Sequence, residues 1–179
     1  MKGSATDIEG VRILEPQVFC DDRGFFFESY NTKTAAALGI DIDFVQDNHS
    51  MSLRGTLRGL HYQVRRQQAK LVRVVCGEVF DVAVDLRRSS PTFGRWFGVR
   101  LSALNRLQLF LPEGFGHGFQ ALSDTAEVLY KASDFYAPDQ ERCIRWNDPD
   151  LAIDWPLPGE MIISAKDAAG SFLRQADLP

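Results

Sequence analysis

One of the three histidines of this chain lies among cations. His61 belongs to the run RGLHYQ (58–63), inside residues 54–73, which carry six basic residues and no Asp or Glu. An imidazole titrates near neutral pH, so His61 is a candidate general base, although a single histidine on a strand is more often structural. The positive charge around His61 has two explanations, and charge alone does not decide between them. The stretch is either a solvated basic edge strand or a site for an anionic small molecule such as a diphosphate.

Lys70, Tyr130 and His117 offer chemistry that would complement such a base. The Lys70 ammonium either extends into water from a strand end or stabilises a developing oxyanion. Tyr130 is either a core aromatic residue or a general acid, because an unperturbed phenol keeps its proton at neutral pH. His117 lies in PEGFGHGF (112–119), whose glycines either form a tight turn or let the backbone approach a ligand.

The histidine spacing argues against a metal centre built on a His-x-His pair. Tyr62 and Gln63 follow His61, and His49 is too far away in sequence to form a local pair with it. A metal site would have to be assembled from distant positions, so we expect none. The remaining chemistry is proton transfer and electrostatic stabilisation.

Short strands separated by turn residues must position these side chains. In residues 79–86, alternate positions are apolar, which predicts a half-buried strand. Residues 70–76 precede it, and Gly77 predicts a hairpin turn between the two strands. Strict alternation puts Arg58 and His61 on opposite faces, but a bulge at Gly59 would bring both to one side. Further strands are predicted at 25–30, 57–63, 96–101, 107–111, 118–122 and 127–132.

Helix is sparse in the pattern. One short helix is predicted at 31–38, capped by Asn31 and ended by Gly39, and a second begins at Ser164 in the capping-box sequence SAKD. Four prolines between 137 and 160 predict an irregular segment that lies across the sheets. Many short strands with little helix predict an all-β sandwich or barrel, for which the jelly roll is the natural closed form.

Length and composition limit the class of protein. The chain has 179 residues, 45% hydrophobic and 25% charged, which is ordinary for one globular domain over residues 1–179. No segment approaches the roughly 18 apolar residues of a membrane span, and a net charge of −4 argues against a nucleic-acid binder. Cys20, Cys76 and Cys143 form no Cys-x-x-Cys motif. We interpret them as reduced, buried thiols of a cytoplasmic protein, a catalytic thiol being the less favoured alternative.

Ordered motifs along nearly the whole chain resemble the dTDP-4-dehydrorhamnose 3,5-epimerases. The matching segments are DDRGFFFESY (21–30), FVQDNHS (44–50), LRGLHYQ (57–63), KLVR (70–73), GEVFDVAVDLR (77–87), PEGFGHGF (112–119), WNDP (146–149) and SAKD (164–167). The resemblance implies a cupin-type jelly roll, a homodimer and no metal or organic cofactor. It also implies conversion of dTDP-4-dehydro-6-deoxy-D-glucose into dTDP-4-dehydro-L-rhamnose by inversion of carbons 3 and 5, which flank the ketone. Crossing of a terminal strand between subunits is a further family expectation.

The family pattern assigns four catalytic roles. His61 is the base and Asp167 orients it, which competes with the helix-capping role of Asp167. Lys70 faces the enolate oxygen, and Tyr130 is the acid on the far side of the sugar ring. Inversion requires the proton donor and the proton acceptor on opposite faces of that ring.

The same pattern assigns substrate contacts. Arg23 and Arg58 lie near the diphosphate with Lys166 as a further cation, and Tyr136 stacks on thymine. The other substrate-binding positions are Glu28, Gln46, Asp47, Asn48, His117 and Glu141. Arg54, Arg65 and Arg66 stay without an assigned role.

Two departures and three alternatives accompany the resemblance. Residues 64–69 are shorter than the proline-containing stretch of many relatives, and Gly116 replaces a common alanine. An epimerase of carbon 3 alone stays open, although Tyr130 favours double epimerisation. A metal-dependent cupin lacks its His-x-His pair here. A non-catalytic sugar-nucleotide binding module would not need His61, Lys70, Tyr130 and Asp167 together.

Overall fold

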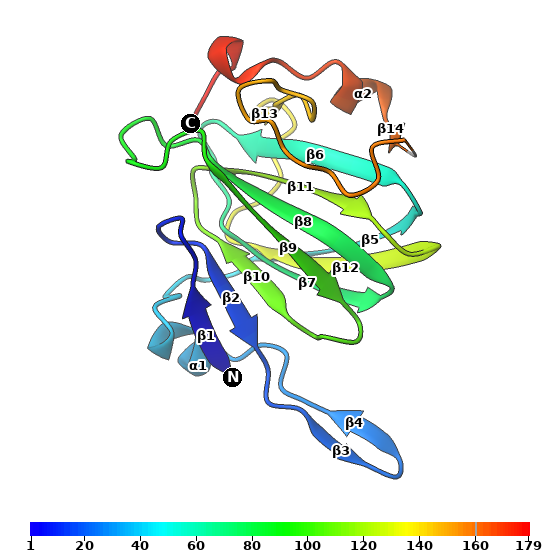
Figure 1. Cartoon of the computed structure of the whole chain (residues 1–179). Helices are drawn as coiled ribbons and strands as arrows, with labels where there is room; N and C mark the ends of the chain where they lie inside the picture. The colour runs from blue at the N-terminus through cyan, green and yellow to red at the C-terminus, as the bar shows by residue number, and fades with distance from the viewer. Residues whose placement is uncertain (160) are drawn as a thin grey trace.

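Two antiparallel sheets pack face to face in the computed structural model, which describes residues 1–159 and 161–179 (Figure 1). The first sheet has the order β1-β2-β10-β7-β12-β5, and the second has the order β13-β6-β11-β8-β9. The strands are β1 (Lys2–Ala5), β2 (Arg12–Glu15), β3 (Phe19–Asp21), β4 (Gly24–Phe26), β5 (Gln46–Leu53), β6 (Thr56–Gln63), β7 (Lys70–Cys76), β8 (Glu78–Asp85), β9 (Trp96–Ser102), β10 (Gln108–Leu111), β11 (Phe115–Ala121), β12 (Thr125–Ala132), β13 (Glu141–Cys143) and β14 (Ile162–Ile163). The predicted all-β jelly roll is confirmed.

Strand β8 is buried on both faces, so the half-buried strand predicted there is wrong. Val79 and Ala83 pack into the core between the sheets. Val82 and Val84 pack into a second cluster on the outer face of the second sheet. Alternation suggested solvent on one face because it counted Asp81 and Asp85 as exposed, whereas both are fully buried.

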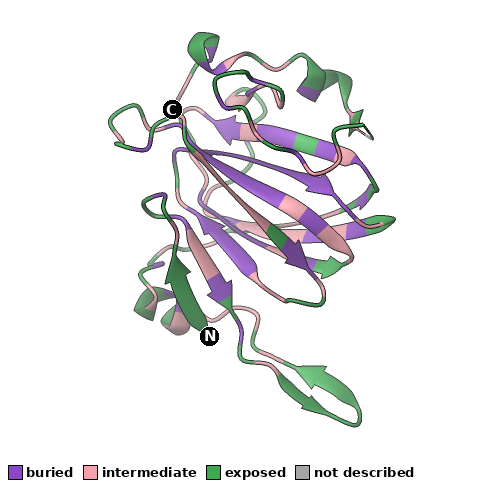
Figure 2. Ribbon diagram, viewed as in Figure 1, coloured by how far each residue is buried: buried purple, intermediate pink, exposed green. Residues whose placement is uncertain are grey.

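The outer cluster is closed by the C-terminal segment, which runs across the second sheet in Figure 1 and covers residues drawn as buried in Figure 2. Ile144, Leu151, Trp155 and Leu173 supply its apolar side chains. The irregular path predicted for 137–160 is confirmed except for the short strand β13, and position 160 lies outside the described residues.

Gly77 marks a change of sheet rather than the predicted hairpin. β7 pairs with β10 and β12 in the first sheet, whereas β8 pairs with β11 and β9 in the second. Gly77 has φ +71°, and a Cβ there would lie 2.1 Å from the Thr125 carbonyl oxygen. A positive φ with no room for a side chain requires glycine both in a hairpin turn and at a change of sheet. The glycine alone therefore does not distinguish the two.

The helices begin where their caps predicted. Asn31 Oδ1 accepts from the backbone N–H groups of Lys33 and Thr34 and caps α1 (Thr32–Ala37), and Gly39 follows its end with φ +80°. Ser164 caps α2 (Ala165–Ala168), and a single 3₁₀ turn forms at Leu173–Gln175. None of the described helices is long and apolar enough to cross a membrane.

The N-terminal third differs most from the expected strands. The strand expected at 25–30 ends at Phe26, and β1, β2, β3 and β5 were not expected. β3 and β4 form a two-stranded hairpin that projects from the sandwich in Figure 1. Its strands are exposed throughout and appear green in Figure 2.

Candidate active site

A bulge in β6 brings the two residues of the RGLH motif to one cavity. His117 of β11 pairs with His61 and Phe119 pairs with Arg58, so two residues of β6 face the single Gly118. A Cβ on Gly59 would lie 2.5 Å from the Gly118 Cα, so only glycine fits at this position. The predicted bulge is confirmed, and both Arg58 and His61 line the cavity.

The cavity lies between the sheets and has a volume of about 230 Å³. Its wall takes residues from β5, β7 and β12 of the first sheet and from β6, β11 and β13 of the second. Seven residues expected from the sequence line it: Arg58, His61, Lys70, His117, Tyr130, Tyr136 and Glu141. Side chains from distant parts of the chain thus face one space.

Behind His61 lies the carboxylate of Asp167, which is 4% exposed. His61 Nε2 is 2.7 Å from Asp167 Oδ1, and the Gly59 N–H donates to Oδ2 at 3.4 Å. Burial raises the pKa of Asp167, but the hydrogen bond and charge of His61 outweigh it and lower the pKa overall. The Asp167 N–H donates to the Ser164 hydroxyl in the cap of α2. Capping uses the backbone of Asp167 and leaves its carboxylate for His61, so the two roles are compatible.

Lys70 does not extend into solvent, which corrects one of its two sequence interpretations. It is 7% exposed and lines the cavity. Among the described residues, no hydrogen bond or ion pair reaches its ammonium, whose Nζ lies 5.9 Å from the centre of the Tyr130 ring. Burial lowers the pKa of Lys70 to about 8, against the charges of Asp81 and Glu141, which raise it. The site therefore contains a buried cation without a direct anionic partner.

Tyr130 stands on the opposite sheet from His61. It comes from β12, whereas His61 comes from β6, and both line the cavity between the sheets. Burial and the charge of Glu141 raise the pKa of Tyr130, so its hydroxyl keeps a proton at neutral pH. A ring placed between the two side chains has a proton acceptor on one side and a donor on the other.

Asp81 is a buried residue of the site that sequence reasoning missed. His117 Nε2 lies 2.9 Å and 3.1 Å from the two Asp81 oxygens, and Asp81 is fully buried while His117 is 6% exposed. His117 lines the cavity beside Tyr130, whose ring centre is 6.4 Å from that of His117, and Asp81 lies behind it. No local pattern points to Asp81, because its partner is 36 residues away.

The open side of the cavity carries polar residues joined to one another. The backbone N–H of Tyr136 donates to Gln46 Oε1 at 2.9 Å, and Gln46 Nε2 donates to Asn48 Oδ1 at 2.9 Å. The Tyr136 hydroxyl donates to Glu141 at 2.6 Å, and Glu141 also accepts from Lys166. Tyr136 and Glu141 line the cavity, and the half-exposed Tyr136 ring presents a flat aromatic face where the cavity meets solvent.

Ser50 was also missed, and the signal for it was present. It lies two residues after Asn48 on β5, so alternation puts it on the face of Gln46 and Asn48. Ser50 lines the cavity, and its buried hydroxyl has no partner among the described residues; the same is true of Asn48 Nδ2. Buried polar atoms without partners in a cavity wall are available to a ligand.

The comparisons with known proteins agree along the whole chain. A family model described as dTDP-4-dehydrorhamnose 3,5-epimerase matches residues 5–175. A relative of that name from Pseudomonas aeruginosa is 60% identical over 178 residues, which cover 99% of this chain and 98% of the relative. This chain belongs to the dTDP-4-dehydrorhamnose 3,5-epimerase family.

Two further relatives show the range of this epimerase family. A solved dTDP-6-deoxy-D-glucose-3,5-epimerase from Legionella pneumophila, in complex with dTDP-4-keto-L-rhamnose, has a TM-score of 0.97 at 50% identity and covers 99% of this chain and 97% of its own. A dTDP-4-dehydrorhamnose 3-epimerase from Streptomyces niveus is 44% identical over 171 residues, 94% of this chain and 82% of the relative. The cupin-type jelly roll implied by the resemblance is confirmed.

Three residues expected at the epimerase site lie away from the cavity. Arg23 is on the projecting hairpin, paired with Asp21 through a 2.6 Å contact. Glu28 accepts from Asn31 Nδ2 at the start of α1. Asp47 points from the other face of β5 to Lys131, whose Nζ is 2.9 Å away. None of these three residues lines the cavity of its own chain in the described structure.

The cysteines differ from the expectation of burial. Cys20 and Cys76 are exposed free thiols, and only Cys143 is partly buried. Burial raises the pKa of Cys143 to about 12, which excludes it as a nucleophile near neutral pH. Its sulfur lies beside His61 and Asp167, and within the described residues these three are the group whose atoms could hold a metal ion.

Proposed function

We propose that the protein converts dTDP-4-dehydro-6-deoxy-D-glucose into dTDP-4-dehydro-L-rhamnose. The observation that carries the proposal is that His61, hydrogen-bonded to Asp167, and Tyr130 lie on opposite sheets of one cavity that the buried Lys70 also lines. The 3,5-epimerase relatives support the same reaction.

In the proposed mechanism, His61 removes the proton next to the ketone. Asp167 takes the Nε2 hydrogen bond, which leaves Nδ1 with a lone pair for the substrate and stabilises the imidazolium that forms. The Lys70 ammonium offsets the negative charge that develops on the ketone oxygen, and its effect is large because burial lowers the dielectric. Tyr130 then returns a proton to the opposite face of the ring. His61 then releases its proton to solvent and Tyr130 regains one, so that a second round can invert the other carbon; together the two rounds invert carbons 3 and 5.

The size of the cavity suggests how the substrate divides between interior and entrance. About 230 Å³ is below the roughly 300–1,000 Å³ typical of sites that enclose a whole small ligand. We place the ketosugar inside and the nucleotide at the entrance. There Tyr136 offers a stacking face for thymine, and Arg58 and Lys166 offer cations for the diphosphate.

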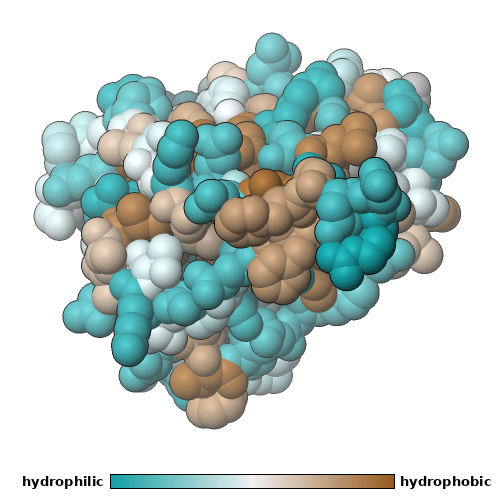
Figure 3. Space-filling view, turned by 90° about the horizontal axis from the view of Figure 1, so that it is seen from below, coloured by the Kyte–Doolittle hydropathy of each residue, from teal (hydrophilic) through white to brown (hydrophobic). Residues whose placement is uncertain are grey.

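We also propose a homodimer formed by a single domain of residues 1–179. The hairpin β3–β4 supports this, since Phe19, Phe25 and Phe26 are each more than half exposed. Figure 3 views the molecule from the end that carries the hairpin, and apolar side chains gather there beside strongly hydrophilic ones. A partner subunit would cover these rings, and Arg23 would then lie near the partner's cavity.

The cytoplasm remains our proposed location, in keeping with three free thiols.

Proton NMR of the protein with dTDP-4-dehydro-6-deoxy-D-glucose in deuterated water tests the reaction. We expect deuterium at both carbon 3 and carbon 5, with the L-rhamno product trapped by a reductase. Deuterium at carbon 3 alone would support the alternative, a 3-epimerase, the name that the Streptomyces niveus relative carries. Binding of dTDP without exchange at either carbon would instead indicate a non-catalytic sugar-nucleotide module.

A further inference from the structure

Three potential metal ligands of different chemistry converge behind the cavity. His61 comes from β6, Cys143 from β13 and Asp167 from α2. One ring nitrogen, the thiol sulfur and one carboxylate oxygen all lie within 4.8 Å of one another. The mechanism above uses the histidine and the carboxylate but leaves the sulfur without a role.

The sheet register fixes this arrangement. Leu60 and Ile144 exchange both of their backbone hydrogen bonds, at 3.0 Å each. The next pair, His61 and Cys143, is therefore a non-hydrogen-bonded pair of antiparallel strands, whose side chains lie on one face at the closest approach that a sheet allows. Asp167 completes the group from the first turn of a capped helix.

Imidazole nitrogen, thiolate sulfur and carboxylate oxygen are the ligands that Zn²⁺ prefers. Three protein ligands with an open fourth position form a common tetrahedral zinc site. With bonds of about 2.0–2.3 Å, ligand atoms of such a site lie roughly 3.3–3.8 Å apart. The three atoms need to move by an ångström or so to reach that geometry. The His61 side chain is 30% exposed on the cavity side, which gives an ion a path from solvent.

We propose that His61, Cys143 and Asp167 form an inhibitory site for a thiophilic divalent cation, represented by Zn²⁺. Coordination by Cys143 releases the thiol proton to solvent. Coordination at His61 Nε2 displaces the proton from that nitrogen, and the ring takes one up at Nδ1 instead. The imidazole then has no lone pair for the substrate, so bound Zn²⁺ stops deprotonation. The inhibition, though not the binding, rests on the proposed function.

Titration of chelator-treated protein with Zn²⁺ during turnover tests the inhibition. We expect a saturable loss of kcat in the wild type. In Cys143→Ala, the Zn²⁺ concentration for half-inhibition should rise by about tenfold or more, because losing a ligand costs at least as much as losing a supporting contact. Cys76→Ala is the matched control, since its exposed thiol is outside the cluster, and its sensitivity should equal that of the wild type. Equal sensitivity of Cys143→Ala and wild type would overturn the proposal.

Co²⁺ binding without substrate gives a readout that does not depend on activity. Titration with Co²⁺ alone should produce thiolate-to-metal charge-transfer absorption in the wild type and in Cys76→Ala but not in Cys143→Ala. Cys143→Ser repeats the test with a poor ligand of similar size, should the alanine variant fold badly. Absence of this absorption in the wild type would overturn the site. Absorption in a protein that turns over no substrate even without metal would refute the proposed function and leave the metal site standing.

Discussion

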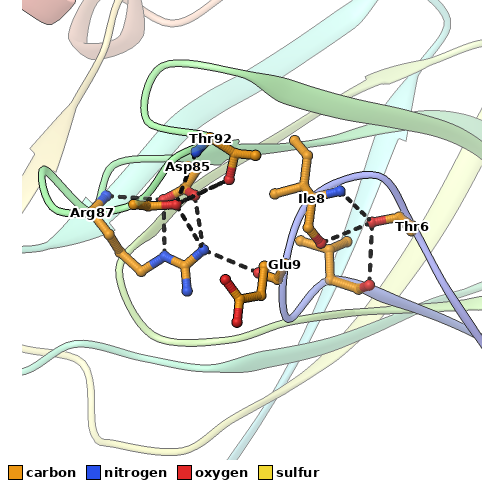
Figure 4. A network of polar contacts seen from close by, with 8 residues as sticks. Thr6, Ile8, Glu9, Asp85, Arg87 and Thr92 are labelled. Carbon is orange, nitrogen blue, oxygen red and sulfur yellow. Dashed lines mark hydrogen bonds and ion pairs between the residues drawn. The ribbon is translucent and has the colours of Figure 1, made fainter.

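Two buried charged residues at strand ends, one in each sheet, have opposite environments. Asp85, at the end of β8, accepts hydrogen bonds from Arg87 and Thr92 (Figure 4). It also accepts one from the Ser90 hydroxyl. Arg87 also donates to the Glu9 carbonyl oxygen at 3.0 Å, which links the N-terminal segment to the end of β8. Lys70, at the start of β7, has no hydrogen bond or ion pair to its ammonium in the described part of the chain.

The shifts in pKa express the same contrast in energy. At Asp85, burial raises the pKa, but the hydrogen bonds outweigh it and lower the pKa to about 2. At Lys70, burial dominates and lowers the pKa to about 8. A buried charge that keeps its hydrogen-bond partners is tolerated by the fold, whereas an uncompensated one weakens it and marks a candidate functional group.

His61→Ala should have the largest effect of the substitutions in the cavity, because it removes the proposed base. Loss of the base should reduce exchange of sugar protons by about 10³–10⁴-fold, at the upper end for general-base catalysis. Affinity for dTDP should stay largely intact, because the proposed nucleotide contacts lie at the entrance. Deuterium exchange and dTDP titration check both points, with His49→Ala as the control histidine outside the cavity. Unchanged turnover would remove His61 as the base.

Asp85→Ala should lower the stability of the fold rather than the activity. Removing the carboxylate leaves Arg87, Ser90 and Thr92 without their acceptor, so we expect a loss of about 3 kcal/mol in the free energy of unfolding. Denaturant unfolding measures it. Asp7→Ala removes an exposed partner of Arg95 and should change the free energy by less than about 0.5 kcal/mol. Similar losses in both variants would contradict the distinction.

Acid should lower the stability that Asp85 and its hydrogen bonds contribute. Because the folded-state pKa of Asp85 is about 2, below the ordinary 3.8, its contribution is complete above pH 3.8 and is lost as pH falls towards 2. Acid unfolding of the wild type should include this loss. Asp85→Ala should lack that component.

Lys70→Met sharpens the contrast, because the substitution should reduce activity and raise stability together. Loss of the cation should lower kcat by about 10²–10³-fold. Removing an uncompensated charge should stabilise the fold by up to about 3 kcal/mol, from a shift of the pKa from 10.5 to about 8. The exposed Lys33 gives the matched control, since Lys33→Met should change neither quantity. A destabilised Lys70→Met would mean that the ammonium has a compensating partner.

The same lysine predicts two opposite dependences on pH. Between pH 8 and 10.5 the unfolded chain binds the proton that folded Lys70 has lost, so the free energy of unfolding should rise with pH across this window. The rate should fall as pH rises through about 8, because the ammonium that offsets the enolate charge is lost. Lys70→Met should show neither Lys70-dependent change.

How far the sequence predicted the fold depended on whether the signal was local. α1 was predicted because Asn31 and Gly39 act on their own neighbours. The burial of β8 was not predicted, since Asp81 is compensated by His117 across the sheet. Gly77 was misread because positive φ suits both a hairpin and a change of sheet.

The candidate site follows the same division. Arg58 and His61 were brought together by a bulge that Gly59 indicated. Asp167 came only from the family resemblance, because no local pattern links it to a histidine 106 residues away. Alternation along β5 could have separated Asp47 from the cavity side and added Ser50.

Tyr130→Phe is the smallest of these changes and tests the order of the proposed steps. It deletes one hydroxyl from the sheet opposite His61, so it should slow reprotonation while the base still removes the proton. We expect product formation to fall by about 10²-fold, at the low end for a general acid, and exchange at the substrate carbons to fall much less. Tyr30→Phe, whose ring packs on Phe44 outside the cavity, controls for loss of a hydroxyl. Equal loss of exchange and product formation would assign Tyr130 to packing and leave the second face of the ring without a donor.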